Sequence, residues 1–159
     1  MLSNNLMPIR VLIGIVIVIV LLSGCANNAT VLDKRSALQA LAGQGSADAQ
    51  YELGRSYCCG RGAGYDKVIA REWFCKAALQ GHGGAQYQLG RMMGERMDTH
   101  SMPGKRQDLI EAYMWYSLAA LQNETLAITE RDALELDLKS QEILESAKRM
   151  RKWQSLECR

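Results

Sequence analysis

The stretch Ala49-Gln50-Tyr51-Glu52-Leu53-Gly54-Arg55 recurs 36 residues later as Ala85-Gln86-Tyr87-Gln88-Leu89-Gly90-Arg91. A second block, AREWFCKAALQ at residues 70–80, recurs 42 residues later as AYMWYSLAALQ at residues 112–122. The second copy therefore carries six additional residues between its two blocks, and a length change confined to one place indicates a loop. Self-similarity with a period of about 20 to 50 residues is the sequence signature of a solenoid. This repeat decides the fold.

Both blocks have the spacing of amphipathic helices. In the first block Ala49, Leu53 and Tyr57 recur at every fourth residue, which places them on one helical face. In the second block the apolar stripe includes the aromatic pair Trp73-Phe74, which becomes Trp115-Tyr116 in the second copy. We expect the alanines of each block to let helices approach closely, while one aromatic pair per unit fills the space between units.

The repeated pattern also carries a family resemblance. Ala-Gln-x-x-Leu-Gly, then Gly-x-Gly, then Ala-x-x-Trp-Phe/Tyr-x-x-Ala-Ala-x-Gln, with Gly-His at residues 81–82, resembles the Sel-one-like repeat, a relative of the tetratricopeptide repeat. The resemblance implies an all-α fold: a short right-handed α-solenoid of antiparallel helix pairs, closed by a C-terminal capping helix pair. We expect this domain over residues 32–155. Its parts are a degenerate unit at 32–44, repeats at 45–80 and 81–122, and capping helices at 123–155.

Local patterns predict where the helices begin. Asp66 and Asp108 are predicted to cap the second helix of each repeat or to lie in its first turn, where a carboxylate is favourable. In the tail, Thr129-x-x-Asp132 resembles a capping box. Ser140 is the predicted cap of the last helix.

The first 24 residues have the organisation of a lipoprotein signal peptide. Residues 11–22 are apolar except for Gly14, and as a helix this run spans only about 18 Å, which is too short to cross a bilayer. Leu22-Ser23-Gly24-Cys25 follows and resembles the lipobox of bacterial lipoproteins. The resemblance implies cleavage between Gly24 and Cys25 and covalent lipid on Cys25.

The residues that follow the tetrapeptide predict where the protein is located. Residues 25–31 are small and polar, and we expect them to form a lipidated tether. Ala26 follows the cysteine where an inner-membrane retention signal would have Asp. The resemblance therefore implies the bacterial cell envelope, lipid-anchored to the outer membrane, with the domain in the periplasm.

Little in the chain suggests catalysis or a nucleic-acid partner. The formal net charge is +2, which gives no basic excess for nucleic acid. We expect His82 to form a hydrogen bond at a helix end rather than to be catalytic. His100 with Met97 and Met102 offers only a weak copper candidate. No cofactor or metal is expected apart from the lipid. Because some cysteine-rich relatives are labelled putative β-lactamases, an envelope hydrolase stays an alternative, as does a metal or thiol redox role.

Four further cysteines remain once Cys25 is assigned to lipid. An even number of cysteines in an exported protein suggests disulfides, and the resemblance implies bonds that join the two helices of a unit. In a plain hairpin, however, the cysteines of the first repeat would be offset by about two turns, beyond the reach of a disulfide. The pairing therefore stays open, with free thiols as the alternative. The candidates are Cys58, Cys59, Cys75 and Cys158.

Stacked helix pairs expose an extended surface suited to peptides and protein edges. The sequence therefore predicts a membrane-anchored, non-enzymatic adaptor whose partner is an unidentified protein or peptide of the envelope or of a host. If the geometry follows the family, the exposed side of each first helix forms the binding face. The predicted binding residues are Glu52, Arg55, Gln88 and Arg91.

Overall fold

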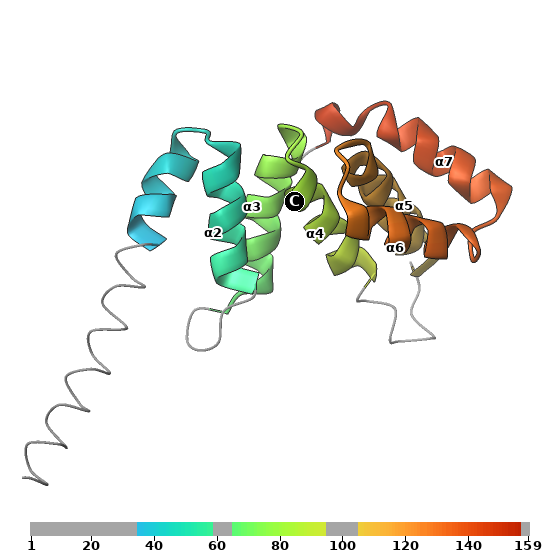
Figure 1. Ribbon diagram of the computed structural model, residues 1–159, viewed down its shortest axis with the longest axis horizontal. Coiled ribbons are helices and arrows are strands. Elements are labelled where there is room, and N and C mark those ends of the chain that lie inside the picture. Colours follow the sequence, from blue (N-terminus) through green and yellow to red (C-terminus); the bar gives the residue numbers. More distant parts are fainter. Residues whose placement is uncertain (1–34, 59–64, 95–104, 157–159) are drawn as a thin grey trace, which may run out of the picture. The chain divides into compact units, whose positions relative to one another are not determined.

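Helices follow one another through the whole of the described chain (Figure 1). The computed structural model describes residues 35–58, 65–94 and 105–156, and residues 38–159 cluster as one unit apart from residues 1–37. Residues 35–43 are helical. They are followed by α2 (Ala47–Cys58), α3 (Lys67–Leu79), α4 (Gly83–Gly94), α5 (Lys105–Leu121), α6 (Thr125–Glu135), α7 (Ser140–Met150) and the short 3-10 helix η2 (Trp153–Ser155). The expected all-helical solenoid is confirmed, with α2–α3 as the first repeat and α4–α5 as the second.

The same backbone turn separates successive units. Gly45, Gly81 and Asn123 all have positive φ, at 94°, 89° and 62°. Each lies in a Schellman motif, in which two amide N–H groups donate to the last carbonyls of the preceding helix; at Gly81, for example, the Gly81 and His82 amides donate to the carbonyls of Ala78 and Ala77 at 2.9 and 3.2 Å. The equivalent turn after residue 43 shows that the helical segment 35–43 ends like the second helix of a unit.

The residue after each turn lies at the start of the first helix of the next unit. Ser46 Oγ accepts a hydrogen bond from the Ala49 amide at 3.3 Å. At the next boundary His82 Nδ1 accepts one from the Ala85 amide at 3.1 Å. The corresponding residue before α6 is Glu124, whose side chain forms no capping hydrogen bond. The helix-end role expected for His82 is confirmed, and α6 begins in the same phase as α2 and α4.

A buried glutamine ties each repeat to the helix before it. Gln50 Nε2 donates to the Ala42 carbonyl at 3.1 Å, and Gln86 Nε2 donates to the Ala78 carbonyl at 3.2 Å. Gln50 Oε1 also accepts from Gln80 Nε2 at 2.7 Å. Gln86 Oε1 is buried, and no described residue donates a hydrogen bond to it. The two glutamines are thus equivalent in position, but only Gln50 uses both ends of its amide.

Glycine brings the two helices of each repeat into close contact. A Cβ atom at Gly54 would lie 2.7 Å from the Phe74 ring, and one at Gly90 would lie 2.6 Å from the Tyr116 ring. These distances are shorter than van der Waals contact, so the aromatic rings pack directly onto the backbones of α2 and α4. Phe74 is fully buried and Tyr116 is 4 % exposed.

The two tryptophans differ more than the sequence predicts. Trp115 is 3 % exposed and belongs to the main core cluster of α3, α4 and α5, onto which Met150, Trp153 and Leu156 also pack. Trp73 is only half-buried; it packs against the small cluster around Ala49 and Leu53. This cluster joins Ala42 of the preceding helical segment to Ala49 and Leu53 of α2, so Trp73 lies between units as expected, but it is less enclosed than Trp115.

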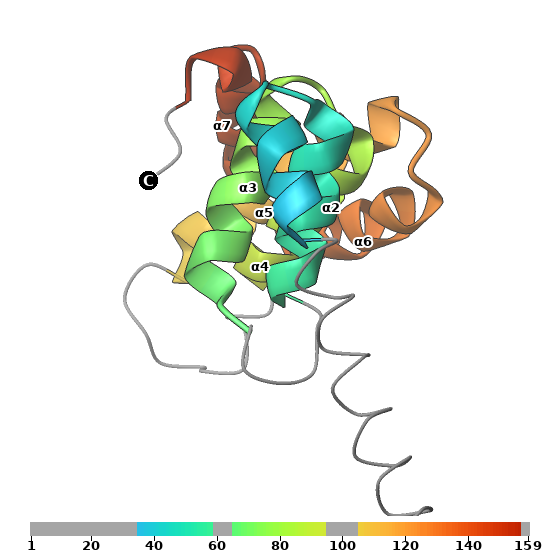
Figure 2. The ribbon, with the colours of Figure 1, turned by 90° about the vertical axis from the view of Figure 1, so that its left-hand side faces the viewer.

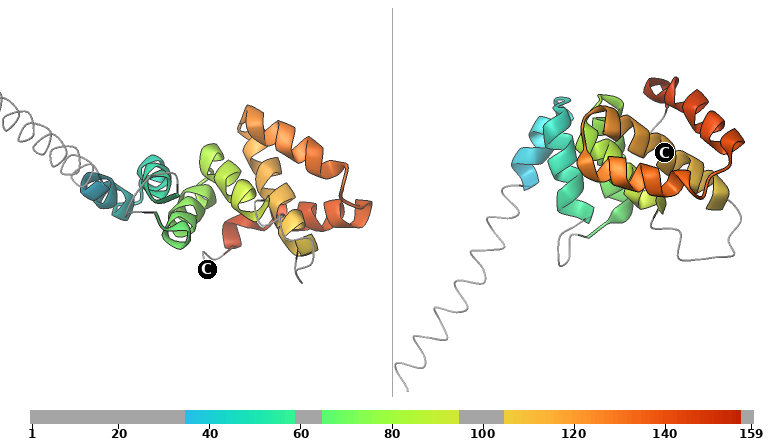
Figure 3. Two further views of the ribbon diagram at one scale, coloured as in Figure 1. Left: turned by 90° about the horizontal axis from the view of Figure 1, so that it is seen from below. Right: turned by 45° about the vertical axis from the view of Figure 1, so that its right-hand side comes forward.

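Helix α5 holds the C-terminal part together. It packs against α4, α6 and α7, as can be followed in Figure 3. Figure 2, which looks along the array from its N-terminal end, shows α3 on one side and α6 on the other. A second cluster, which includes Met93, Tyr116, Ala127 and Leu134, fills the space between α4, α5 and α6.

Two of the predicted helix starts are confirmed and two are wrong. Asp66 caps α3, since its carboxylate accepts from the amides of Val68 and Ile69 at 2.8 and 3.0 Å. Asp108 lies in the first turn of α5, which starts at Lys105 and so extends further towards its N-terminus than α3. The capping box at Thr129 is wrong, because α6 already begins at Thr125. Ser140 is the first residue of α7 rather than its cap, which is Lys139.

The extra turn of α5 anchors the turn between α6 and α7. Arg106 forms an ion pair with Glu142 and donates to the Asp137 carbonyl at 3.4 Å. Glu142 Oε2 in turn accepts from the Lys139 amide at 2.7 Å, which holds the start of α7. A single arginine therefore fixes the start of α7 to the start of α5.

No helix within the described ranges is long and apolar enough to cross a membrane. The predicted signal peptide, Cys25 and the tether at 25–31 lie outside the described residues.

Candidate functional site

The predicted binding residues form matching pairs on the first helix of each repeat. On α2, Arg55 Nη1 lies 3.0 Å from Glu52 Oε1, with both side chains about half exposed. On α4, Arg91 Nη1 lies 3.5 Å from Gln88 Oε1. Residues three apart are neighbours on a helix surface, so each repeat presents one such pair at the same place. The structure therefore brings the four residues onto equivalent faces of two helices.

Helix α6 presents the same two positions with different chemistry. Because the turn at Asn123 repeats the turn at Gly81, the position of Gln88 is taken by Glu130 and that of Arg91 by Ala133. Both residues are exposed. Ala133 cannot supply the guanidinium that pairs with Glu52 on α2. Within the described part of the chain, no side chain forms a hydrogen bond or an ion pair with the Glu130 carboxylate.

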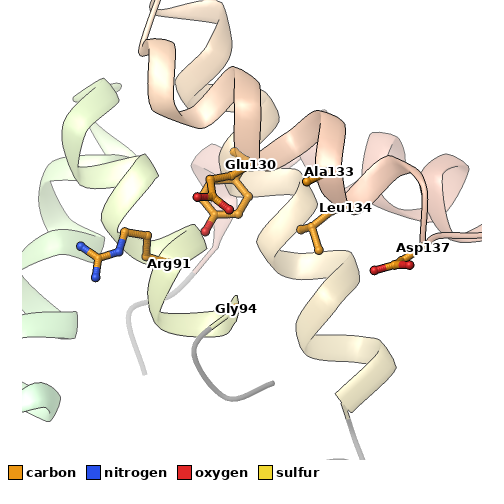
Figure 4. A pocket seen from close by; sticks show the side chains of 7 residues that line it. Arg91, Gly94, Glu130, Ala133, Leu134 and Asp137 are labelled. Atoms are coloured by element: carbon orange, nitrogen blue, oxygen red, sulfur yellow. The ribbon is translucent and has the colours of Figure 1, made fainter. Parts of the chain in front are cut away.

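A surface pocket lies where α4 faces α6 (Figure 4). Its volume is about 380 Å³, within the range of pockets that hold small ligands or side chains. Arg91 and Gly94 come from α4, and Glu130 and Ala133 come from α6 on the other side. The lining residues are Arg91, Gly94, Tyr116, Glu130, Ala133, Leu134 and Asp137.

The pocket follows from small residues on both walls. Gly94, the last residue of α4, has no side chain to fill the space, and Ala133 extends only a methyl group from α6. Tyr116 and Leu134, both nearly buried, contribute apolar surface to the lining. The result is a cavity with an apolar base and charged residues around it.

The charges around the pocket are unequal in sign and in orientation. Two carboxylates, Glu130 and Asp137, line it together with one guanidinium, that of Arg91. In Figure 4 the Arg91 side chain extends away from Glu130 and from Asp137, in keeping with its hydrogen bond to Gln88. Counted over the described residues, the lining therefore carries one more negative charge than positive charge.

Two of the three described groups with shifted pKa values, Arg106 and Glu142, form the ion pair that joins α5 to the cap next to the pocket. The hydrogen bond from Arg106, followed by that from the Lys139 amide, holds the pKa of Glu142 below its usual range. The same Glu142 hydrogen bond raises the pKa of Arg106, with smaller contributions from the charges of Glu142 and Asp137. Asp137 thus already interacts electrostatically with a cation, Arg106.

The histidines and cysteines do not form a site in the described ranges. His82 stacks on Tyr51 with ring centroids 4.4 Å apart, and its Nε2 lies 3.5 Å from Asp48 Oδ1. Within those ranges, no three His, Cys, Asp or Glu residues are arranged to hold a metal ion. The weak copper candidates His100, Met97 and Met102 lie outside the described residues.

Two of the candidate cysteines are described, and both Cys58 and Cys75 are disulfide-bonded. Cys75 is nearly buried in the main core cluster, and Cys58 packs beside it as a partly buried residue. Cys59 and Cys158 lie outside the described residues, and the pairing of the four cysteines stays open as in the sequence.

The sequence analysis did not identify the α6 wall of the pocket. Glu130 and Asp137 lie in a segment assigned only to capping, because α6 lacks the Ala-Gln-x-x-Leu-Gly motif. The repeat period could have located this wall. Ala127 lies 42 residues after Ala85, and both are fully buried. Adding the same 42 residues to Gln88 and Arg91 gives Glu130 and Ala133.

Comparison with known proteins agrees with the repeats found in the sequence. The model of the Sel1 repeat matches residues 47–82 and 84–124, which correspond to α2–α3 and α4–α5 with their following turns. No curated protein matches the chain. Sel1 repeats generally mediate protein–protein interactions, and their helical fold is typically non-catalytic. The chain is a Sel1-like repeat protein, built as a helical solenoid around two Sel1 repeats.

Proposed function

We propose that this protein is an envelope lipoprotein that acts as a non-enzymatic adaptor. It is held at a membrane by lipid on Cys25 and binds a protein partner through the first helices of its repeats. The observation that carries the binding proposal is the matched display of polar pairs on α2 and α4, continued by Glu130 on α6 beside an open pocket.

The surface is suited to a peptide or to a protein edge. Two repeats and a cap expose a limited area, so an affinity in the range of transient complexes is expected. The ion pair between Arg55 and Glu52 restrains both side chains to some degree before binding. Such ordering lowers the entropy lost when a partner docks.

Photocrosslinking in intact cells tests the binding face. A photoreactive amino acid is placed in turn at Glu52, Arg55, Gln88 and Arg91, and at exposed Lys148 on α7 as the control. We expect one discrete adduct from the first-helix positions and none from Lys148. Equal adducts from all five positions, or none from any, would contradict the proposal.

The anchor is tested independently. Cys25→Ser removes the sulfur to which the lipid would be attached, so labelling with radioactive palmitate is expected to disappear and the protein to become extractable without detergent. A Ser23→Ala control, which keeps a small residue in the tetrapeptide, should stay labelled. Labelling of Cys25→Ser at the normal level would show that the anchor lies elsewhere.

A further inference from the structure

We infer that the pocket between α4 and α6 receives a lysine or arginine side chain from a peptide segment of the partner. This inference rests on the proposed adaptor function and specifies the chemistry of its partner. The inference is carried by one difference between equivalent helices. On α2, Arg55 pairs with the acidic residue Glu52, whereas the position of that arginine on α6 is occupied by Ala133.

The helices α2, α4 and α6 differ in how the residue at this position is paired. On α2, Glu52 forms an ion pair with Arg55 at 3.0 Å. Gln88 is neutral, and Arg91 donates to it at 3.5 Å. On α6, Glu130 is acidic like Glu52, but the residue three positions later is Ala133 and cannot pair with it. No other described side chain forms an ion pair with Glu130. Because Glu130 is exposed and hydrated, its carboxylate is available to form a charge-assisted hydrogen bond with a cation of a bound partner.

The surroundings of Glu130 fit a long basic side chain rather than a bare ion. Ala133, Leu134 and Tyr116 provide apolar surface against which the methylene stem of lysine or arginine can pack, while its charged end reaches the carboxylate. The volume of about 380 Å³ accommodates such a side chain together with neighbouring backbone of the bound peptide.

Asp137 and Arg91 set the polarity of the pocket. Asp137 adds a second negative charge to the lining, on the far side from α4. Arg91 extends away from both carboxylates in Figure 4, so its guanidinium does not occupy the place of the incoming cation.

Selection from a random peptide library displayed on phage, with the purified full-length protein as bait, tests this inference. We expect the selected peptides to be enriched in lysine or arginine at one position, next to apolar residues. Replacing that residue by norleucine in a synthetic peptide should weaken binding about three- to tenfold, the range of a partly exposed charge-assisted contact. Binding should also weaken as salt concentration rises.

Three variants distinguish this pocket from the rest of the face. Glu130→Gln removes the charge, and Ala133→Arg restores the arginine found at the equivalent positions of α2 and α4; both should abolish the preference for basic peptides. Ala133 is exposed on a helix, so that variant is expected to fold normally. Glu72→Gln, which removes an exposed carboxylate of α3 that lies outside the pocket lining and the first helices, should bind the selected peptides like the unaltered protein.

The outcomes separate this inference from the adaptor function. Selected peptides without a basic preference, or a preference that survives both Glu130→Gln and Ala133→Arg, would overturn the inference; photocrosslinking from α2 and α4 would still support an adaptor. Failure to select any peptide would also count against the pocket. Self-association that depends on Glu130 in sedimentation experiments would assign the pocket to a second copy of this chain, and the inference would be wrong.

Discussion

The first and second repeats share a sequence pattern but differ in what surrounds them. Trp115 in the second repeat is enclosed by α3, α4 and the returning tail, whereas Trp73 in the first repeat is half-buried beside residues 38–42. Gln50 in the first repeat uses both ends of its amide, and Gln86 in the second leaves its oxygen unpaired. Equivalent residues in a repeat protein therefore do not contribute equally to stability, because each contribution depends on the neighbouring unit.

The largest expected difference is between the two tryptophans. Trp115→Ala should lower the free energy of unfolding by about 3–5 kcal/mol, the usual cost of truncating a buried aromatic residue. Trp73→Ala should cost about 1–2 kcal/mol, because less of its surface is buried: it packs on a small cluster, and Lys76 lies over its ring. Urea denaturation followed by circular dichroism measures both. Equal losses would show that the fuller enclosure of Trp115 by α3, α4 and the tail adds no stability.

The glycines at the aromatic contacts should behave alike in the two repeats. Gly54→Ala and Gly90→Ala each place a methyl group within 3 Å of a buried ring. Overpacking of this kind costs about 1–3 kcal/mol, which exceeds the helix-propensity gain of about 1 kcal/mol. Gly43→Ala, where a Cβ meets nothing within 4 Å, is the matched control and should not lose stability by overpacking. A stabilised Gly54 or Gly90 variant in thermal unfolding would show that the rings can move aside.

The paired glutamines give a smaller contrast. Gln50→Ala removes hydrogen bonds to the Ala42 carbonyl and to Gln80, whereas Gln86→Ala removes one hydrogen bond and also an unsatisfied oxygen. We expect Gln50→Ala to be more destabilising than Gln86→Ala by about 1 kcal/mol. Parallel urea titrations of the two variants provide the measurement. The reverse order would mean that the orphaned oxygen of Gln86 is satisfied in solution.

The smallest effect concerns the cap attached to the second repeat. The pKa of Glu142 is lowered in the folded protein, chiefly by Arg106, so the pair stabilises the fold when pH is above the ordinary glutamate pKa. This contribution is lost as pH falls through the lowered folded value. Glu142→Gln should therefore reduce thermal stability slightly at neutral pH and flatten its decline in acid. An acid profile identical to that of the unaltered protein would rule out this role, and Glu130→Gln is the matched control.

Much of this architecture could be predicted from the repeat pattern alone. The spacing of small and aromatic residues located α2 to α5, and Asp66 was recognised as a cap, because these features depend on local sequence. Helix α6 was placed, but its start at Thr125 was missed, since Glu124 provides no capping side chain and Thr129 imitates one. The different burial of Trp73 and Trp115 depends on where the tail packs, which no local pattern encodes.

The candidate site also contains a part that the sequence predicts and a part that it does not. Glu52, Arg55, Gln88 and Arg91 were predictable because they recur at a fixed period on exposed positions. The α6 wall of the pocket is made by a unit that has lost its motif, so its residues could be found only by extending the period past Asn123 or by observing the folded chain.

The turns at Gly45, Gly81 and Asn123 share the same pattern of hydrogen bonds, and this identity has a genetic consequence. A DNA segment that encodes residues 45–80 begins and ends at equivalent joints, so unequal recombination could duplicate it in frame without straining the backbone at either junction. The number of repeats is thus free to change between generations, while the terminal helices continue to cover the two ends. In such a lineage, binding surface is gained by copying a unit rather than by altering one.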